Sequence, residues 1–197
     1  MTIAIIGKGN VGTALGDGWT ATGHNVVYGV KTPSEPDEST VADAVAGADI
    51  VALAVPWPAV GSDLLGGADT RGKIILDCTN PIRADFSGLE SLAAGSAGET
   101  VAQLFPEAHA VKAFNTVGFN IMRDPGFDAV QASMLVAGDD AGAKATVMGL
   151  ASDLGFTPED AGPITQSGLL EHFAWLWITM ALKFGHSREM AFVLHKR

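Results

Sequence analysis

Short runs of apolar residues alternate with longer amphipathic or alanine-rich stretches along most of the chain. The apolar runs predict strands at 3–6, 25–30, 50–55, 73–77, 109–114, 133–137 and 156–160. The stretches between them predict helices at 11–22, 39–46, 96–105, 140–154 and 166–184. Unbroken apolar strands separated by helices are typical of a parallel sheet covered on both faces. The pattern therefore predicts a doubly wound, mostly parallel α/β sheet, which binds ligands at the carboxyl ends of its strands.

Capping residues mark several of these boundaries. Gly23 and Gly47 follow the first two helices, where glycine commonly ends a helix. The run Ser96-Ala97-Gly98-Glu99 is a capping box, and Asp139 or Asp140 is suited to cap the next helix. Residues 81–95 and 122–127 have no periodic pattern and predict irregular segments.

The composition is that of a globular protein. Hydrophobic residues make up 47% of the 197 residues and charged residues 17%, which excludes disorder, and the net charge of −10 argues against nucleic-acid binding. No apolar run reaches the ~18 residues that span a bilayer, and the chain starts with a strand instead of a signal peptide. The single cysteine, Cys78, suits a reducing compartment, so we expect a cytoplasmic protein without membrane partners.

The first strand runs directly into a glycine-rich turn. Gly7, Gly9 and Gly12 have the spacing G-x-G-x-x-G between an apolar strand and a helix. The first glycine permits the tight turn, the second lets a pyrophosphate approach the backbone, and the third lets helix and strand pack closely. The helix N-terminus then offers free N–H groups to phosphates. We therefore expect a dinucleotide-binding Rossmann domain; a glycine-rich turn without a ligand is the alternative.

This domain is expected to cover residues 1–197, because no repeat, low-complexity segment or linker divides the chain. Within it, residues 163–197 are expected to carry the C-terminal helix. The apolar piece Met190–Leu194 is a candidate edge strand.

The end of the second strand indicates which dinucleotide binds. An NAD-binding domain has Asp or Glu there, ~20 residues after the glycines, to hold the ribose 2′-hydroxyl. Here the corner is Tyr28-Gly29-Val30-Lys31-Thr32, with Lys31 in place of the acid. A cation favours the 2′-phosphate of NADP, and Lys8 in the glycine turn adds a second positive charge. The residues therefore predict NADP, with a solvated surface lysine as the alternative for Lys31.

Several further motifs occur in order along the chain. They are Gly7-Lys8-Gly9-Asn10-Val11-Gly12, Gly29-Val30-Lys31, Val55-Pro56-Trp57, Lys112-Ala113-Phe114-Asn115-Thr116, Val136-Ala137-Gly138-Asp139-Asp140, and Asp160-Ala161-Gly162-Pro163 followed by Ser167 and Leu170-Glu171. On these motifs, the chain resembles over nearly its whole length the NADP-dependent reductases of the deazaflavin coenzyme F-420. It is also similar to the nucleotide domain of the STEAP ferric reductases.

The resemblance implies an oxidoreductase that transfers hydride between NADPH and a flavin-like acceptor such as coenzyme F-420. It implies that Val55 and Pro56 lie along the cofactor and that Asn115 and Thr116 approach the nicotinamide. The expected cofactor-binding residues are therefore Gly7, Lys8, Gly9, Asn10, Val11, Gly12, Val30, Lys31, Val55, Pro56, Asn115 and Thr116.

The chain departs from this family's pattern at three places. The family usually has Ser-Arg where this chain has Val30-Lys31, and often an arginine where this chain has Gly168. The deazaflavin enzymes have histidine at the position of Asn115. These differences are compatible with an NADP site and leave the second substrate open.

Hydride transfer between two such cofactors needs no protein nucleophile and no metal, because the cofactors carry the chemistry and the protein positions them. We therefore expect no catalytic side chain and no metal ligands, since the histidines lack metal-ligand spacing. Near the expected cleft, Cys78 is expected to be packed, and Asp77 and Asn80 to orient loop backbone. Trp57 either stacks on a ring or closes the core.

The last predicted helix is apolar over most of its surface. Its stripe consists of Leu169, Leu170, Phe173, Leu176, Trp177, Met180, Ala181 and Phe184, with Trp175 and Ile178 on the other side. A helix that is apolar all round is buried, here against a second subunit. We expect a homodimer through this helix; a cofactor-facing role for Trp175 or Trp177 is the alternative.

Two other functions are compatible with the residues. An imine or hydroxy-acid dehydrogenase would need an additional helical domain, for which few residues follow the last strand–helix unit. An NADP-sensing module without enzymatic activity would bind the nucleotide and signal through its dimer. Oxidation of NADPH in the presence of a flavin or deazaflavin distinguishes the first function from the last.

Overall fold

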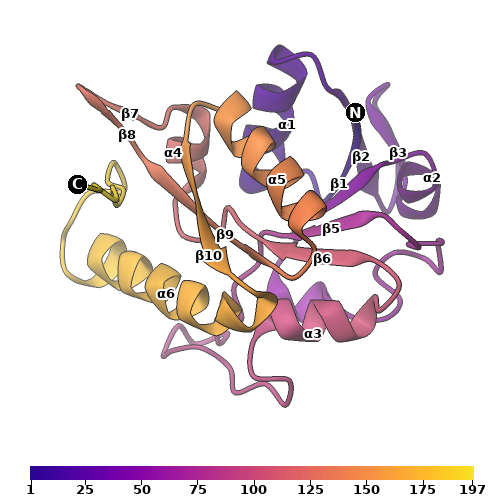
Figure 1. Ribbon diagram of the computed structural model, residues 1–197. Coiled ribbons are helices and arrows are strands. Elements are labelled where there is room, and N and C mark those ends of the chain that lie inside the picture. Colours follow the sequence, from indigo (N-terminus) through magenta and orange to yellow (C-terminus); the bar gives the residue numbers. More distant parts are fainter.

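A twisted sheet of eight strands forms the centre of the computed structural model, which describes all 197 residues (Figure 1). Their spatial order is β10-β9-β6-β5-β4-β1-β2-β3. The strands are β1 (Thr2–Ile6), β2 (Asn25–Val30), β3 (Glu38–Thr40), β4 (Ile50–Leu53), β5 (Ile74–Asp77), β6 (His109–Lys112), β9 (Ser133–Gly138) and β10 (Thr157–Gly162). The strand order reverses between β1 and β4, and such a switch point is where doubly wound sheets bind ligands.

Helices cover both faces of this sheet (Figure 1). They are α1 (Asn10–Ala21), α2 (Val41–Ala46), α3 (Ala97–Leu104), α4 (Phe119–Arg123), α5 (Ala141–Asp153) and α6 (Ser167–Lys183), with the 3-10 turns η1 (Trp57–Ala59) and η2 (Ile164–Gln166). No helix is both long enough and apolar enough to cross a membrane. The architecture confirms the predicted doubly wound α/β domain with a C-terminal helix.

The side chains of β1 alternate between two separate cores. Ile3 and Ile5 lie in the cluster beneath α1 and α5, whereas Ala4 and Ile6 lie in the cluster beneath α2 and α3. All four are at most 2% exposed, as expected for a strand buried on both faces. Both cores therefore fix the position of the glycine turn that follows β1.

Most of the predicted boundaries are confirmed within a few residues. The capping box is present, because Ser96 Oγ accepts a hydrogen bond from Glu99 N at 3.1 Å and donates one to Glu99 Oε2 at 2.7 Å. Of the two candidate caps of α5, Asp140 is the one used, accepting from Ala143 N at 2.7 Å. Gly23, with φ of +90°, follows α1 as predicted.

The predicted helix at 39–46 is wrong at its start. Residues Glu38–Thr40 form strand β3, which pairs in parallel with Tyr28–Val30 of β2. Helix α2 then begins at Val41, because the Thr40 hydroxyl accepts from Asp43 N at 3.2 Å and caps it. A strand of three residues is too short to leave a periodic pattern. The third strand also ends at Leu53, two residues earlier than predicted.

The segment predicted as irregular at 122–127 is largely ordered. Helix α4 ends within it, and a hairpin of β7 (Gly126–Phe127) and β8 (Val130–Gln131) follows. The turn of this hairpin contains Asp128 in a left-handed conformation, with φ of 47°. Aspartate tolerates that conformation better than most residues, so the turn is possible without glycine.

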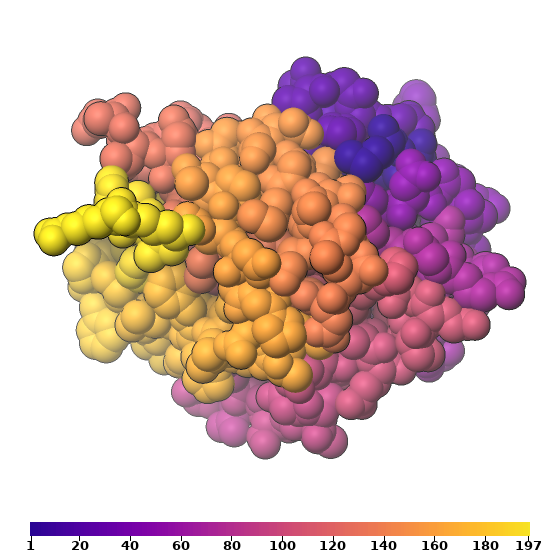
Figure 2. Space-filling view, in the orientation of Figure 1, coloured from indigo at the N-terminus to yellow at the C-terminus, as the bar shows by residue number.

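The predicted edge strand at Met190–Leu194 does not form. Strand β9 pairs with β10 along one side and with β6 at its last two residues, and the tail hydrogen-bonds to β9 only at Ser133 at its start, which is too little to form a strand. The tail instead crosses the start of β9, where Ser133 N donates to Phe192 O at 3.0 Å and Leu194 N donates to Ser133 Oγ at 2.9 Å. Figure 2 shows these last residues, in yellow, on the outside of the molecule.

The sheet contains one antiparallel pair. Only Val111 and Lys112 of β6 pair with β9, opposite Gly138 and Ala137. Every other neighbouring pair in the sheet is parallel. The expected parallel character is thus confirmed for the β1–β6 portion that carries the candidate site.

Candidate functional site

The three glycines after β1 have different steric environments. A Cβ on Gly7, whose φ is +103°, would lie 2.7 Å from Ala54 O, and one on Gly12 would lie 2.1 Å from Gly7 O. A Cβ on Gly9 would meet nothing within 4 Å. Gly7 and Gly12 are therefore required by the fold itself, whereas Gly9 borders open space at the start of α1.

The N-terminus of α1 is available to a ligand. Gly9 is its N-cap residue, and no side chain caps the helix or places an acid in its first turn. The N–H groups of the first turn have no intrahelical partners, and the helix dipole makes this end positive. Asn10 and Val11, two of the expected cofactor residues, lie in this turn and are exposed and half-buried. The turn can therefore bind an anionic group over Gly9.

A pocket of about 740 Å³ adjoins the glycine turn. Its walls come from the ends of β1 and β2, the start of α2 and the segment 55–66 after β4. Four of the expected residues line it, namely Gly7, Val30, Lys31 and Val55. Pro56 is exposed and does not line the pocket. It precedes the turn η1, whose Pro58 and Ala59 do line it. The pocket thus lies at the switch point between β1 and β4.

The two lysines of the site have different surroundings. Lys31 is exposed at the end of β2 and takes part in none of the ion pairs. Lys8 Nζ instead contacts carboxylates of Glu35, Asp37 and Glu38 at 2.6, 2.9 and 3.1 Å. Its hydrogen bonds to these acids, that to Glu35 most of all, raise the pKa of Lys8 above its ordinary value. The ammonium of Lys8 is therefore directed to the β2–β3 loop and not to the pocket.

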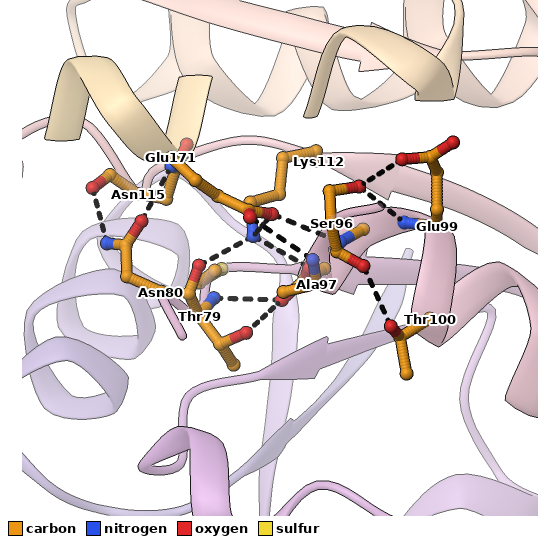
Figure 3. Close-up of polar contacts among 12 residues, drawn as sticks. Thr79, Asn80, Ser96, Ala97, Glu99, Thr100, Lys112, Asn115 and Glu171 are labelled. Atoms are coloured by element: carbon orange, nitrogen blue, oxygen red, sulfur yellow. Dashed lines mark hydrogen bonds and ion pairs between the residues drawn. The ribbon is translucent and has the colours of Figure 1, made fainter. Parts of the chain in front are cut away.

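Asn115 and Thr116, which follow β6, lie outside the large pocket and are 5% and 2% exposed. Asn80, which follows β5, donates to Asn115 O at 2.8 Å and accepts from Asn115 Nδ2 at 2.9 Å (Figure 3). This pairing fixes the Asn115 amide, whose buried Oδ1 has no hydrogen-bond partner. Asn80 thus orients loop backbone as expected, and Asn115 presents a free acceptor.

A strained residue precedes this pair. Phe114 is 1% exposed and has φ of +60°, an uncommon conformation for a bulky aromatic residue. Its ring packs edge-on against Trp19 and Phe156, with centroid distances of 5.7 and 6.1 Å. The left-handed turn redirects the chain immediately after β6. Nothing in the sequence distinguishes this phenylalanine from an ordinary core residue.

A buried ionic cluster lies beneath the strand ends (Figure 3). Lys112 Nζ contacts Asp77 Oδ2 at 2.8 Å, Glu171 Oε1 at 3.1 Å and Thr79 O at 2.6 Å. The carboxylate of Glu171 also accepts from Ala97 N and Gly98 N at the start of α3. Burial alone lowers the pKa of Lys112, but the two carboxylates raise it above its ordinary value. Lys112 and Glu171 belong to the motifs noted above, but no role was predicted for either of them.

The remaining candidates are packed. Cys78 is buried, which raises the pKa of its thiol, and this confirms a packed cysteine. Trp57 is 8% exposed in the core beneath α2 and α3, which favours the core-closing alternative, and it donates to Glu90 Oε2 at 3.2 Å. Trp177 donates to Met190 O at 2.8 Å, and Trp175 stacks with Lys183. Neither of the last two lines the pocket.

Comparison with known proteins identifies the relatives of this chain. The model of a family described as NADP oxidoreductase, coenzyme F420-dependent, matches residues 2–81. The chain is 29% identical over 178 residues to metalloreductase STEAP3 of Rattus norvegicus. The aligned region covers 86% of this chain and 35% of that protein. The chain therefore spans about a third of the length of that curated relative.

Solved structures share the fold over most or all of the chain. A protein from Arthrobacter sp. FB24, provisionally named an F420-dependent NADP-reductase, is 29% identical with a TM-score of 0.84 over 100% of both chains. A hypothetical protein from Sinorhizobium meliloti is 30% identical with a TM-score of 0.75, over 85% of this chain and 88% of that one. A reductive aminase from Aspergillus terreus shares the fold alone, at 20% identity and a TM-score of 0.67 over 93% and 62%.

The family match covers the region from β1 to the residues just after β5, which contains the glycine turn and the pocket. The full-length similarity extends the relationship to α6. The chain therefore matches this NADP oxidoreductase family over residues 2–81, and its similarity to solved structures extends over the rest of the chain.

Proposed function

We propose that this protein binds NADP(H) along the carboxyl ends of β1, β2 and β4 and transfers hydride between NADPH and a flavin-like acceptor. The observation that carries the proposal is the open backbone at Gly9, the uncapped start of α1, in the same turn as Gly7, which lines the 740 Å³ pocket. Steric freedom, unpaired N–H groups and a neighbouring cavity are what a dinucleotide requires.

The residues present fit NADP. We assign the pyrophosphate to the turn from Gly9 to Val11, and the adenosine to the adjoining pocket. Lys31 lines this pocket at the end of β2, and its ammonium is free to pair with a 2′-phosphate. Asp63, the one acid in the pocket lining, comes from the segment after β4, and no acid at the end of β2 lines the pocket as in NAD-binding domains. The predicted preference for NADP is therefore retained.

We assign the nicotinamide to the ends of β5 and β6. The unpartnered Oδ1 of Asn115 is a buried acceptor that suits an N–H donor of a ligand. Bound NADPH supplies the hydride, and the chain's own residues orient the ring and exclude water. Asn80 fixes the Asn115 amide, and Thr116 extends the same buried wall. Coenzyme F-420 is the acceptor suggested by the name of the Arthrobacter relative.

The test begins with calorimetric titration of NADPH and NADH into the protein. We expect NADPH to bind more tightly, and failure to bind either nucleotide contradicts the proposal. The second step is to mix protein and NADPH with F-420, FMN or FAD and to follow the absorbance of NADPH. Oxidation with one of these acceptors supports the reductase, whereas binding without turnover supports an NADP-sensing module.

We also propose a homodimer through α6. One side of this helix is buried, with Leu170, Ala174 and Trp177 at most 7% exposed. The adjacent side carries Leu169 and Leu176, which are 67% and 49% exposed, with the half-buried Phe173 between them. Large apolar side chains at this spacing form an apolar stripe that a second copy of α6 would bury.

A further inference from the structure

Lys8 makes more ionic contacts than any other surface residue of the site. Its Nζ meets the carboxylates of Glu35, Asp37 and Glu38, which we call the acidic loop, at 2.6–3.1 Å. It also lies 4.9 Å from the centroid of the Tyr28 ring. An ammonium has three N–H donors, and each of them is used by one carboxylate. Lys8 therefore has no donor left for a phosphate in this arrangement.

The acidic loop is in an unfavourable place for a protein that binds NADP. It follows Lys31 by a few residues and is held against the glycine turn by Lys8. The 2′-phosphate of NADP belongs at this end of β2 and carries negative charge. Three carboxylates face one ammonium, so two negative charges are uncompensated in the loop that follows Lys31.

The three acids differ in how firmly they are held. Glu38 is 9% exposed, and its Oε2 accepts from Ser34 N at 2.8 Å and from Glu35 N at 3.2 Å. The side chains of Glu35 and Asp37 are 62% and 47% exposed and contact Lys8. Glu38 therefore anchors the fold of the loop, whereas the carboxylates of Glu35 and Asp37 are held by Lys8.

We propose that Lys8 is a positioning residue that sets the preference for NADP over NAD by holding the acidic loop against the glycine turn, away from the ribose. The inference rests on the proposed NADP site. Without Lys8, the three carboxylates repel one another, the loop rearranges, and Glu35 and Asp37 become free to approach the 2′-phosphate. NAD has no phosphate there, so its binding is much less affected.

This role differs from direct binding of the phosphate by Lys8. If Lys8 acts through the acidic loop, removing the mobile carboxylates removes the need for it. If Lys8 binds the phosphate itself, removing them frees its donors, and it becomes more important. The two roles therefore predict opposite couplings between Lys8 and the acids, which a double-mutant cycle measures.

The experiment measures dissociation constants of NADPH and NADH by calorimetry for four proteins: the parent, Lys8→Met, Glu35→Gln/Asp37→Asn, and the triple variant. Glu38 is kept because it anchors the loop. We expect Lys8→Met alone to lower the NADPH-to-NADH affinity ratio about three- to fivefold, the size of a surface ion-pair effect. In the Glu35→Gln/Asp37→Asn background the same change should lower the ratio less than about twofold.

Further readouts exclude a purely structural effect. Lys8→Arg should restore the ratio, because a guanidinium can bridge the same carboxylates. Amide hydrogen exchange of residues 34–38 without nucleotide should rise in Lys8→Met and return towards the parent level in the triple variant. Loss of affinity for both nucleotides in equal proportion would contradict a role in preference.

An equal or larger drop of the ratio in the neutralised background overturns the inference and assigns Lys8 to the phosphate directly. These results are distinguishable from failure of the proposed function. If the parent protein binds neither nucleotide, the proposed site itself is wrong. If the parent prefers NADPH but the cycle shows no coupling, only the role of Lys8 is wrong.

Discussion

At the residue scale, position along the glycine turn separates residues needed by the fold from residues available to a ligand. Gly7 and Gly12 have backbone atoms where a side chain would stand, whereas Gly9 faces open space. The G-x-G-x-x-G pattern alone predicts all three glycines, but not which of them can be replaced without loss of folding. The sequence likewise predicts the same role for Lys8 and Lys31, two cations near the expected phosphates. In the structure Lys8 pairs with carboxylates, whereas Lys31 lines the pocket.

Replacing Gly9 tests the proposed pyrophosphate site. The φ of Gly9 is −83°, and a Cβ there meets no atom within 4 Å, so Gly9→Val should fold with a melting temperature near that of the parent. The branched side chain occupies the space assigned to the pyrophosphate, so calorimetry should detect at least about a tenfold loss of affinity for NADPH and NADH alike. In contrast, Gly12→Ala should unfold or melt far lower, because its Cβ would lie 2.1 Å from Gly7 O. Unchanged binding by Gly9→Val would contradict the assignment.

Lys31→Gln tests the proposed 2′-phosphate contact. Loss of a charge-assisted hydrogen bond to phosphate should weaken NADPH binding about tenfold and leave NADH binding nearly unchanged. Arg71→Gln is the control, because it removes a cation from the loop before β5, at the amino end of a parallel strand, whereas Lys31 follows the carboxyl end of β2. Equal effects of the two changes would indicate a general charge effect and not a local contact.

At the element scale, the elements with strong patterns were predictable and the short ones were not. The buried strands and α1, α5 and α6 follow from apolar runs, caps and glycines. The three-residue β3 and five-residue α4 depend on partners distant in sequence, such as the pairing of Tyr28 with Glu38. The same holds for the site, since the Asn80–Asn115 pair joins two loops 35 residues apart. Local patterns contain no information about such contacts.

The ionic cluster of Lys112, Asp77 and Glu171 connects the sheet to α3 and α6. In Glu171→Ala, the ammonium of Lys112 loses a buried partner and the N–H groups of Ala97 and Gly98 lose their acceptor. Breaking a buried pair in this way costs about 3–5 kcal/mol, which urea denaturation can measure. Glu107→Ala, at an exposed acid between α3 and β6, should change stability by less than about 0.5 kcal/mol.

The pH dependence of this cluster follows from the raised pKa of Lys112 in the folded state. A raised pKa means that the stabilising contribution is complete below the ordinary lysine pKa of 10.5 and is lost as the pH rises through the folded value. Stability measured by urea denaturation should therefore fall more steeply in strongly alkaline solution for the parent than for Lys112→Met. A steeper alkaline loss in Lys112→Met would contradict this role.

At the scale of the whole molecule, α6 and the residue that follows it expose large apolar side chains to solvent. Phe184, just after the helix, is 72% exposed, and Leu182 is 49% exposed. Sequence predicted an apolar helix but not which side faces solvent, because that depends on how the helix packs against α3. The side left open carries the residues of the proposed dimer interface.

Light scattering after gel filtration tests this dimer. The parent is expected to elute with the mass of two chains, and Leu176→Glu with the mass of one, because a buried carboxylate at a two-fold interface is strongly unfavourable. Thr20→Glu adds the same charge on the exposed side of α1 and should leave the mass unchanged. A parent protein with the mass of one chain would contradict the proposal.

The reversed direction of β9 separates the part of the protein that selects the electron acceptor from the part that selects the nucleotide. Only the final two residues of β9 pair with β6, so β9 and β10 extend past the ends of the parallel strands, as Figure 1 shows. They form a wall beside the strand ends where we place the nicotinamide, far along the sheet from the β2 corner. We therefore expect changes on this wall to alter the choice of electron acceptor while nucleotide choice stays constant, so the two selectivities can evolve independently.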